Sequence, residues 1–302
     1  MSVSEALERA YAIHNRDCVR GMRERVGDGT VDLVLADPPY FKTIGEKWDY
    51  RWRTEREYVE WSEQWMGETV RTLRLGGSFY LFGYFWMLCR LLPILESLGM
   101  ELRQQIMVDK GLRSVAGRAT RGYKMFPTVT ESILFLYKDP KPFVRKFLKE
   151  RQRTLGLDAR EINEQLGVKS NGGGMWSIFT SANVCAQMPT EDIWNRLERI
   201  LDFCCPYRSI VQTWHAQPGL GDVWRDIDFY GDKPRLHPAQ KPLKLMERLI
   251  VASSDPNDLV LDPFAGSGTA AVACRRLGRR YVGFEMNTAY YDKCMERLHR
   301  TG

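Results

Sequence analysis

The chain has 302 residues and lacks several features that would place it in other classes of protein. Its seven cysteines form no C-x-x-C pair, and Cys204 and Cys205 are adjacent, which argues against a zinc site and a disulfide framework. No apolar run is long enough to cross a membrane, and the sequence shows no signal peptide, internal repeat or low-complexity tail. These absences predict a cytoplasmic protein with reduced, mostly buried thiols, no membrane contact and no bound metal.

The composition itself is that of a folded globular protein. Hydrophobic residues make up 44% of the chain and charged residues 27%, which suits one large α/β domain, alone or with a small insertion. The net charge of +6 favours an anionic partner, although charge alone does not identify that partner as nucleic acid.

One short apolar segment ends in an unusual turn. Residues 31–36 predict a buried strand, which is followed by Asp37, Pro38, Pro39 and Tyr40. The two prolines have a fixed φ and no N–H, so the chain must leave the sheet in a rigid, extended turn. Open α/β sheets bind their ligands at the carboxyl ends of strands. A carboxylate, a backbone carbonyl and an aromatic ring there suit an exocyclic amine on a flat heterocycle. Taken in isolation, however, the motif favours an ordinary strand-ending turn.

A second apolar strand, residues 259–261, runs into a glycine-containing turn. The turn carries the cofactor-site candidates Asp262, Phe264, Gly266, Ser267, Gly268 and Thr269. Glycine permits close approach of backbone to a ligand, and the N-terminus of the helix predicted at 270–277 favours a carboxylate or phosphate. Glu285 ends the next predicted strand, where doubly wound folds bind ribose hydroxyls. The dinucleotide-binding form G-x-G-x-x-G is absent, because Ala271 occupies the third glycine position.

Together, D-P-P-Y at 37–40 and F-x-G-x-G at 264–268 resemble the motif pair of amino-group DNA methyltransferases. The D-P-P-Y motif precedes the glycine motif, which is similar to the β group of that family, with its many bacterial and phage adenine-N6 enzymes. D-V-W at 222–224 and H-P-A-Q-K-P at 237–242 strengthen the resemblance, which spans residues 11–298. It implies an α/β fold with a Rossmann-like S-adenosylmethionine-dependent methyltransferase sheet in permuted motif order, and a small helical insertion.

The resemblance implies roles for individual residues. The catalytic loop would be Asp37, Pro38, Pro39 and Tyr40. S-adenosylmethionine would be bound by the glycine-loop residues and Glu285, together with Asp17, Cys18, Asp37, His237, Gln240 and Lys241. From the local sequence alone, a helix cap explains Asp17 nearly as well. Lys241 and the adjacent helix N-terminus suit the cofactor carboxylate, and the alternative is a capping lysine on a surface turn.

Basic and aromatic residues suggest where DNA would lie. Phe41, Lys42 and Trp48 belong to a loop that would border a flipped base, unless its tryptophans pack on the core. Arg113, Arg118 and Arg121 lie in a basic, glycine-containing loop suited to phosphate contact. Lys169 lies in a segment, 140–205, that the resemblance identifies as the target-recognition region.

The remaining pattern predicts the order of elements. We expect helices at 57–75, stopped by Gly76 and Gly77, and at 86–98, with strands at 78–83 and 102–109 and an antiparallel strand within 122–138. Residues 1–139 and 206–302 would then form the catalytic domain. The insertion at 140–205, with helices at 158–167, 175–181 and 189–203, resembles a helix-turn-helix unit, although its glycine triplet, 172–174, is longer than a tight turn requires. A helical lid without base contacts is the alternative.

These features predict a mechanism. Asp37 and the Pro38 carbonyl would accept the hydrogens of an amino group, freeing its lone pair, while Tyr40 stacks on a base flipped from the duplex. An acid before Pro-Pro-Tyr favours adenine N6 over cytosine N4. Methylation of cytosine N4, of RNA or of a protein, and an inactive DNA-binding protein, remain the alternatives. Double-stranded DNA is the expected partner, and a cognate restriction endonuclease and a homodimer stay open.

Overall fold

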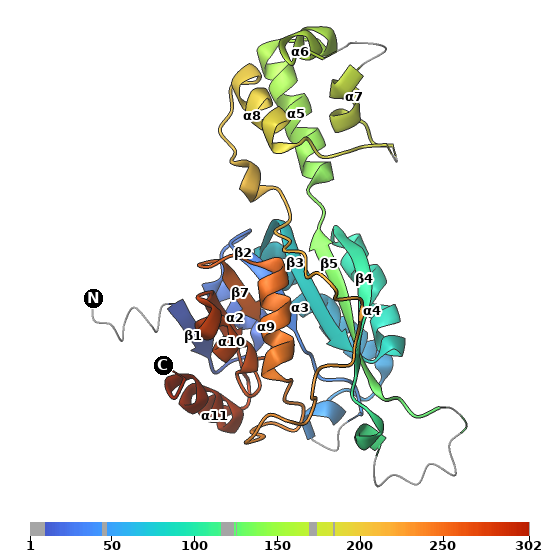
Figure 1. The fold of residues 1–302 in the computed structure, drawn as a ribbon, viewed down its shortest axis with the longest axis vertical. Coiled ribbons are helices and arrows are strands. Elements are labelled where there is room, and N and C mark those ends of the chain that lie inside the picture. The colour runs from blue at the N-terminus through green and yellow to red at the C-terminus, as the bar shows by residue number, and fades with distance from the viewer. Residues whose placement is uncertain are drawn as a thin grey trace. The chain divides into compact units, whose positions relative to one another are not determined.

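The computed structural model describes residues 10–43, 47–115, 124, 126–168, 174–183 and 185–301, and of residues 47 and 48 only the backbone. The chain divides into two compact units (Figure 1). The first unit combines residues 1–138 and 213–302, and the second consists of residues 139–212. Within the described ranges, no helix is both long and apolar enough to span a membrane.

An eight-stranded sheet forms the centre of the first unit, in the order β1-β8-β7-β2-β3-β5-β4-β6. The strands are β1 (Tyr11–His14), β2 (Val31–Ala36), β3 (Leu73–Gly83), β4 (Met100–Asp109), β5 (Thr130–Lys138), β6 (Val223–Trp224), β7 (Leu259–Asp262) and β8 (Arg280–Phe284). Strand β5 is antiparallel to its neighbours β3 and β4, and the other neighbouring pairs are parallel. The predicted α/β class and the antiparallel strand are therefore confirmed.

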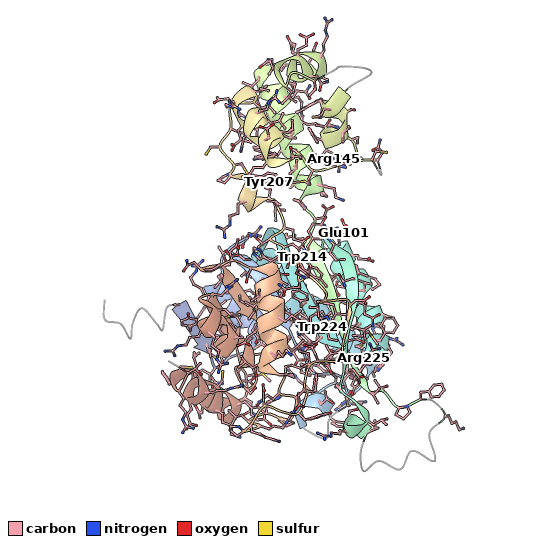
Figure 2. All side chains as sticks on the ribbon, viewed as in Figure 1. Glu101, Arg145, Tyr207, Trp214, Trp224 and Arg225 are labelled. Carbon is pink, nitrogen blue, oxygen red and sulfur yellow. The ribbon has the colours of Figure 1, made fainter. Side chains whose placement is uncertain are left out.

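Helices cover both faces of this sheet (Figure 1). One face packs against α2 (Cys18–Arg25), α3 (Glu55–Thr72) and α4 (Phe85–Ser97), and the other against α9 (Leu243–Ser253), α10 (Thr269–Leu277) and α11 (Thr288–His299). Side chains of β2 alternate between the two faces: Val34 joins the first core and Leu35 the second. Trp224 of β6 (Figure 2) belongs to the second core, and its indole N–H donates to the Gly221 carbonyl at 2.7 Å.

The centre of the sheet contains a topological switch point. Strands β2 and β7 are parallel neighbours, with Leu33 opposite Val260. The helix that follows β2, α3, packs on one face, whereas the helix that follows β7, α10, packs on the other. The two connections therefore diverge and leave a crevice at the carboxyl ends of the strands, where ligands of open α/β sheets bind.

The predicted end of the first long helix was wrong. We expected a helix over 57–75 stopped by Gly76 and Gly77, but α3 ends at Thr72 and both glycines lie inside β3. Leu73 already pairs with Val31 of β2, and a register shift follows between Val31 and Leu33. Gly76, with φ of +70°, supplies the left-handed backbone at this irregular part of the ladder.

The second unit is helical. It consists of α5 (Lys141–Leu155), α6 (Ala159–Gln165), α7 (Gly174–Thr180) and α8 (Glu191–Ile200), followed by a short 3-10 turn. Asp158 and Glu161 form a capping box at the start of α6. The sequence analysis predicted no helix over the residues that form α5. Residues 169–173, between α6 and α7, lie outside the described residues, so the helix-turn-helix interpretation stays a prediction.

Candidate active site

A pocket of about 480 Å³ opens at the switch point of the first unit. Its walls come from the turns after β2 and β7, the start of α2, the turn before α9, and the end of β8. The pocket is lined by the sequence-predicted residues Asp17, Cys18, Asp37, Pro38, Pro39, Tyr40, His237, Gln240, Lys241, Asp262, Phe264, Gly266, Ser267, Thr269 and Glu285. The fold thus brings together segments that are more than two hundred residues apart in the sequence.

Gly268 is the one predicted cofactor-site residue that is not part of this lining. It precedes α10 with φ of +72°, and a Cβ built on it would lie 2.3 Å from Cys294 Sγ. Glycine is therefore required here for backbone conformation and for the close approach of α11.

Asp37 is held by a buried lysine. Lys241 Nζ donates to both carboxylate oxygens of Asp37, at 2.7 and 2.6 Å, and the Tyr40 hydroxyl donates to Asp37 Oδ1 at 2.7 Å. Lys241 and Asp37 are 4% and 18% exposed, respectively. Lys241 is thus engaged with the D-P-P-Y acid in this structure, in the place where the sequence suggested a cofactor carboxylate.

Glu131 of β5 completes this cluster. The Tyr40 hydroxyl also contacts Glu131 Oε1, Lys110 Nζ donates to Glu131 Oε2 at 3.0 Å, and Lys241 Nζ lies 3.5 Å from Oε1. Sequence reasoning missed both Glu131 and Lys110. The available signal was an acid at the start of the apolar strand Ile133–Leu136, where a buried carboxylate needs a partner.

The charges in this cluster perturb one another. Burial raises the pKa of Asp37, Glu131 reinforces that rise, and Lys241 opposes it. Burial also opposes the ionisation of Glu131, but Lys241 and Lys110 outweigh it and hold the pKa of Glu131 below its usual range. The pKa of Lys241 is raised, because the two carboxylates outweigh the effect of burial. Perturbed groups that converge on a pocket are typical of catalytic sites.

The sequence predicts that the ring of Tyr40 stacks on a base. In the structure its hydroxyl is anchored to the two carboxylates, its ring meets the edge of the Tyr84 ring at 5.5 Å, and Lys241 Nζ lies 5.1 Å from its centroid. Tyr40 still lines the pocket, so base stacking stays a prediction, and its hydroxyl has an additional structural role.

The glycine turn is coupled to the acid at the end of β8. Gly266, with φ of +52°, donates its N–H to Glu285 Oε2 at 2.9 Å, and Asn287 N–H donates to Oε1 at 2.7 Å. Burial raises the pKa of Glu285. It also raises the pKa of Asp262 to about 7, although the Phe264 N–H and the Tyr281 hydroxyl both donate to this carboxyl group.

Two residues of the 237–242 turn have informative surroundings. Gln240 is 3% exposed, and its Oε1 accepts from Leu236 N–H at 2.9 Å, while its Nε2 has no hydrogen-bond partner in the described part of the protein. The pKa of His237 is lowered to about 4 by burial and by Lys241, so this ring is neutral at physiological pH. A buried amide that lines a pocket with an unused donor is suited to a ligand acceptor.

The sequence suggested two roles for Asp17, a helix cap and a cofactor contact. It caps α2, its side chain accepting from Arg20 N–H at 3.1 Å, and it also lines the pocket. Cys18 is buried, and burial raises its pKa well above the usual range of a thiol. Cys18 is therefore not a reactive nucleophile.

The predicted DNA contacts divide into three groups. Phe41 is partly buried against Tyr58, and Lys42 donates to the Arg53 carbonyl at 2.6 Å, so these two residues brace the loop. Arg113 is exposed. The side chain of Trp48, together with Arg118, Arg121 and Lys169, lies outside the described residues.

A glycine turn, a helix N-terminus and a distal acid beside a buried, lysine-bound carboxylate are features of α/β enzymes that bind a nucleoside-containing cofactor next to a reacting group. Comparison with known proteins defines the family. The model of a family described as DNA methylase matches residues 31–296, so the chain belongs to that family.

Individual relatives agree over nearly the whole chain. The type II methyltransferase M1.MboII of Moraxella bovis is 28% identical over 281 residues, which cover 93% of this chain and 94% of the relative. The DNA adenine methyltransferase YhdJ of Escherichia coli (strain K12) is 26% identical over 275 residues, covering 89% and 76%. The structure of TTHA0409 from Thermus thermophilus, complexed with S-adenosyl-L-methionine, superposes with a TM-score of 0.56 at 21% identity, covering 96% and 93%, and has the same fold.

Proposed function

We propose that this DNA methylase transfers a methyl group from S-adenosylmethionine to the N6 amino group of adenine in double-stranded DNA. One observation carries the proposal: the Asp37 carboxylate and the Gly266–Glu285 turn face the same pocket. A cofactor bound against the turn would therefore present its reactive end beside the carboxylate, which is the positioning that transfer of an activated methyl group requires.

The residues of the pocket fit this cofactor. Glu285 has acceptor capacity beyond the bonds it accepts from the backbone, which suits ribose hydroxyls, and the unused donor Gln240 Nε2 suits an acceptor such as a carboxylate. The volume lies within the range of small-molecule sites. S-adenosylmethionine would supply a methyl group already activated by a sulfonium centre, so the protein has only to bind, align and accept a proton.

Asp37 and Pro38 would prepare the target nitrogen. An exocyclic amine is a weak nucleophile, because its lone pair is delocalised into the ring. Hydrogen bonds from its two N–H groups to Asp37 and to the Pro38 carbonyl would hold the lone pair towards the methyl group. The cofactor would supply the methyl group and keep the electron pair of the bond that is broken, while Asp37 would accept the proton that the nitrogen loses. The base must be flipped from the helix to reach this depth.

Two observations support adenine as the target. The acid at position 37 precedes Pro-Pro-Tyr, where a serine would favour cytosine N4, and the relative YhdJ is named a DNA adenine methyltransferase. Cytosine N4 remains the second candidate, because an exocyclic cytosine amine offers the same two hydrogens to the same two acceptors.

The helical unit would contact the DNA backbone. Lys146, Lys149 and Arg153 of α5 are exposed, and their spacing of three and four residues places them on one face of the helix. Each phosphate contact contributes about one unit to the salt dependence of binding. Replacing all three with glutamine should therefore weaken DNA binding and reduce the slope of log K against log salt by as much as about three. Arg56→Gln, on an exposed face of α3, is the control.

The test of the activity is sequencing of genomic DNA together with mass spectrometry of its nucleosides, from cells that express the wild type, Asp37→Ala or Asp28→Ala. Asp28 is an exposed acid, so its variant is the matched control. We expect N6-methyladenine with the wild type and with Asp28→Ala, and none with Asp37→Ala.

The alternatives give different results. Detection of N4-methylcytosine in place of N6-methyladenine would make cytosine the target base. Methylation of adenines in all sequence contexts would keep the proposed reaction but would make the helical unit a DNA contact without sequence specificity. A folded wild-type protein that binds S-adenosylmethionine and leaves DNA unmodified would refute the proposal.

A further inference from the structure

Glu131 has no role in the mechanism above, yet it lies at its centre. Its side chain is 4% exposed, and it comes from β5, an element outside the family motifs quoted above. One carboxylate oxygen meets Lys110, and the other meets the Tyr40 hydroxyl and faces Lys241. Burial of a carboxylate carries a large desolvation cost, so a charged glutamate at this position lowers the stability of the fold unless its interactions compensate.

The cluster is balanced in charge. Two carboxylates, Asp37 and Glu131, face two ammonium groups, Lys110 and Lys241. Lys241 contacts both acids, and Tyr40 bridges them through one hydroxyl. If Glu131 were neutral, Asp37 would be the only carboxylate in the cluster to face Lys241. Asp37 would then hold Lys241 more tightly and would be a weaker hydrogen-bond acceptor and base.

We propose that Glu131 is a positioning residue for methyl transfer: it holds Tyr40 and shares Lys241, and so keeps Asp37 oriented and available to the target amino group. This inference rests on the proposed function. Glu131 is not among the described residues that line the pocket, and it acts through Tyr40, Lys241 and Asp37.

Other groups also face Asp37. Tyr40 belongs to the same turn, Lys241 to the turn before α9, and Asp262 to the end of β7, while Tyr58 of α3 interacts with Asp37 electrostatically. Replacement of Glu131 changes the surroundings of Tyr40 and Lys241, which contact it, whereas no contact joins it to Asp262 or Tyr58 in the described part of the protein. A change in the titration of Asp37 in that variant therefore reports on the charge of Glu131 and on its contacts with Tyr40 and Lys241.

The test compares purified Glu131→Gln with wild type and with Glu101→Gln. Glu101 (Figure 2) makes a partly exposed ion pair with Arg103 on β4, so the control changes the same residue type on the same sheet. We expect kcat of Glu131→Gln to fall about tenfold or more, while calorimetric binding of S-adenosylmethionine changes less than about twofold. The acid limb of its pH–rate profile should move to lower pH, because a negative neighbour that raises the pKa of Asp37 is gone.

Lys110→Met provides an independent measurement. Without Lys110, Glu131 interacts more strongly with Lys241, and Lys241 then stabilises the negative charge of Asp37 less. The pKa of Asp37 should rise, so the acid limb should move to higher pH. The double variant Glu131→Gln/Lys110→Met should lie between the single variants. Loss of structure alone would not displace the two profiles in opposite directions.

The inference is overturned if Glu131→Gln keeps the kcat of Glu101→Gln, or if both single variants move the acid limb the same way. A wild-type protein that methylates no DNA would overturn the proposed function itself, whereas an active wild type with an unaffected Glu131→Gln would overturn only the role of Glu131.

Discussion

Replacement of Lys241 by methionine tests the buried charge cluster most directly. The side chain of Lys241 is 4% exposed, and its ammonium group lies 2.6 Å from Asp37 and 3.5 Å from Glu131. The substitution keeps much of the length and apolar stem of this side chain but removes the ammonium group. Two carboxylates are then left beside each other in a region that water barely reaches, with Lys110 as the nearest cation to Glu131.

The magnitude follows from this geometry. Removal of one partner of a buried ion pair costs about 3–5 kcal/mol. At roughly 2–4 °C per kcal/mol for a unit of this size, the melting temperature should fall by about 10 °C. Without Lys241, the pKa of Asp37 rises further above its unfolded value, so the folded state keeps a proton that the unfolded chain releases. The loss of stability should therefore be greatest at high pH and should shrink as the pH falls and Asp37 takes up its proton in the folded state.

The assay is thermal and urea unfolding of Lys241→Met at several pH values, with Lys244→Met as the control. Lys244 lies three residues further on, is exposed and pairs with Asp226 at the surface, so its loss should cost less than about 1 kcal/mol. Equal stability of the two variants at pH 8 would refute the reasoning, as would a loss in Lys241→Met that does not depend on pH. Methylation by Lys241→Met should also fall, because a higher pKa of Asp37 leaves a smaller fraction of this group ionised to accept the amine proton.

Three further predictions concern the cofactor side of the pocket. Gly268→Ala should lower the melting temperature, because its Cβ would lie 2.3 Å from Cys294 Sγ and its φ of +72° would be strained; adding Cys294→Ala should recover only part of the loss. The pKa of His237 is about 4 in the folded state and about 6.5 in the unfolded chain, so the wild-type free energy of unfolding should fall as the pH drops through that interval. His237→Gln should make this fall smaller in urea titrations. Glu285→Gln should weaken S-adenosylmethionine binding about tenfold in calorimetry, since it keeps the size of the side chain but replaces an acceptor with a donor; unchanged affinity would remove Glu285 from the cofactor site.

Local motifs account for most of what could be predicted of the site. The D-P-P-Y turn and the glycine turn each combine a strand end with residues whose backbone or charge limits the local structure, so their place at the carboxyl edge of the sheet follows from short stretches of sequence. The structure brings both turns to one pocket. The helix end near residue 75 was wrong because Leu73 pairs with a distant strand, and pairing partners cannot be found from a local window.

The sequence by itself determined the α/β class and most strands and helices of the first unit, because periodicity, prolines and glycines act over a few residues. The resemblance to a family, carried by short motifs, named the residues that meet at the switch point. Only the tertiary structure decided that Lys241 binds Asp37 across more than two hundred residues, and that Glu131 and Lys110 share the same cluster. The amino-acid sequence alone does not indicate a function for a single glutamate at the start of an apolar strand. Its role depends on which charges the sheet places within a few ångströms, where weak screening makes each charge control its neighbours.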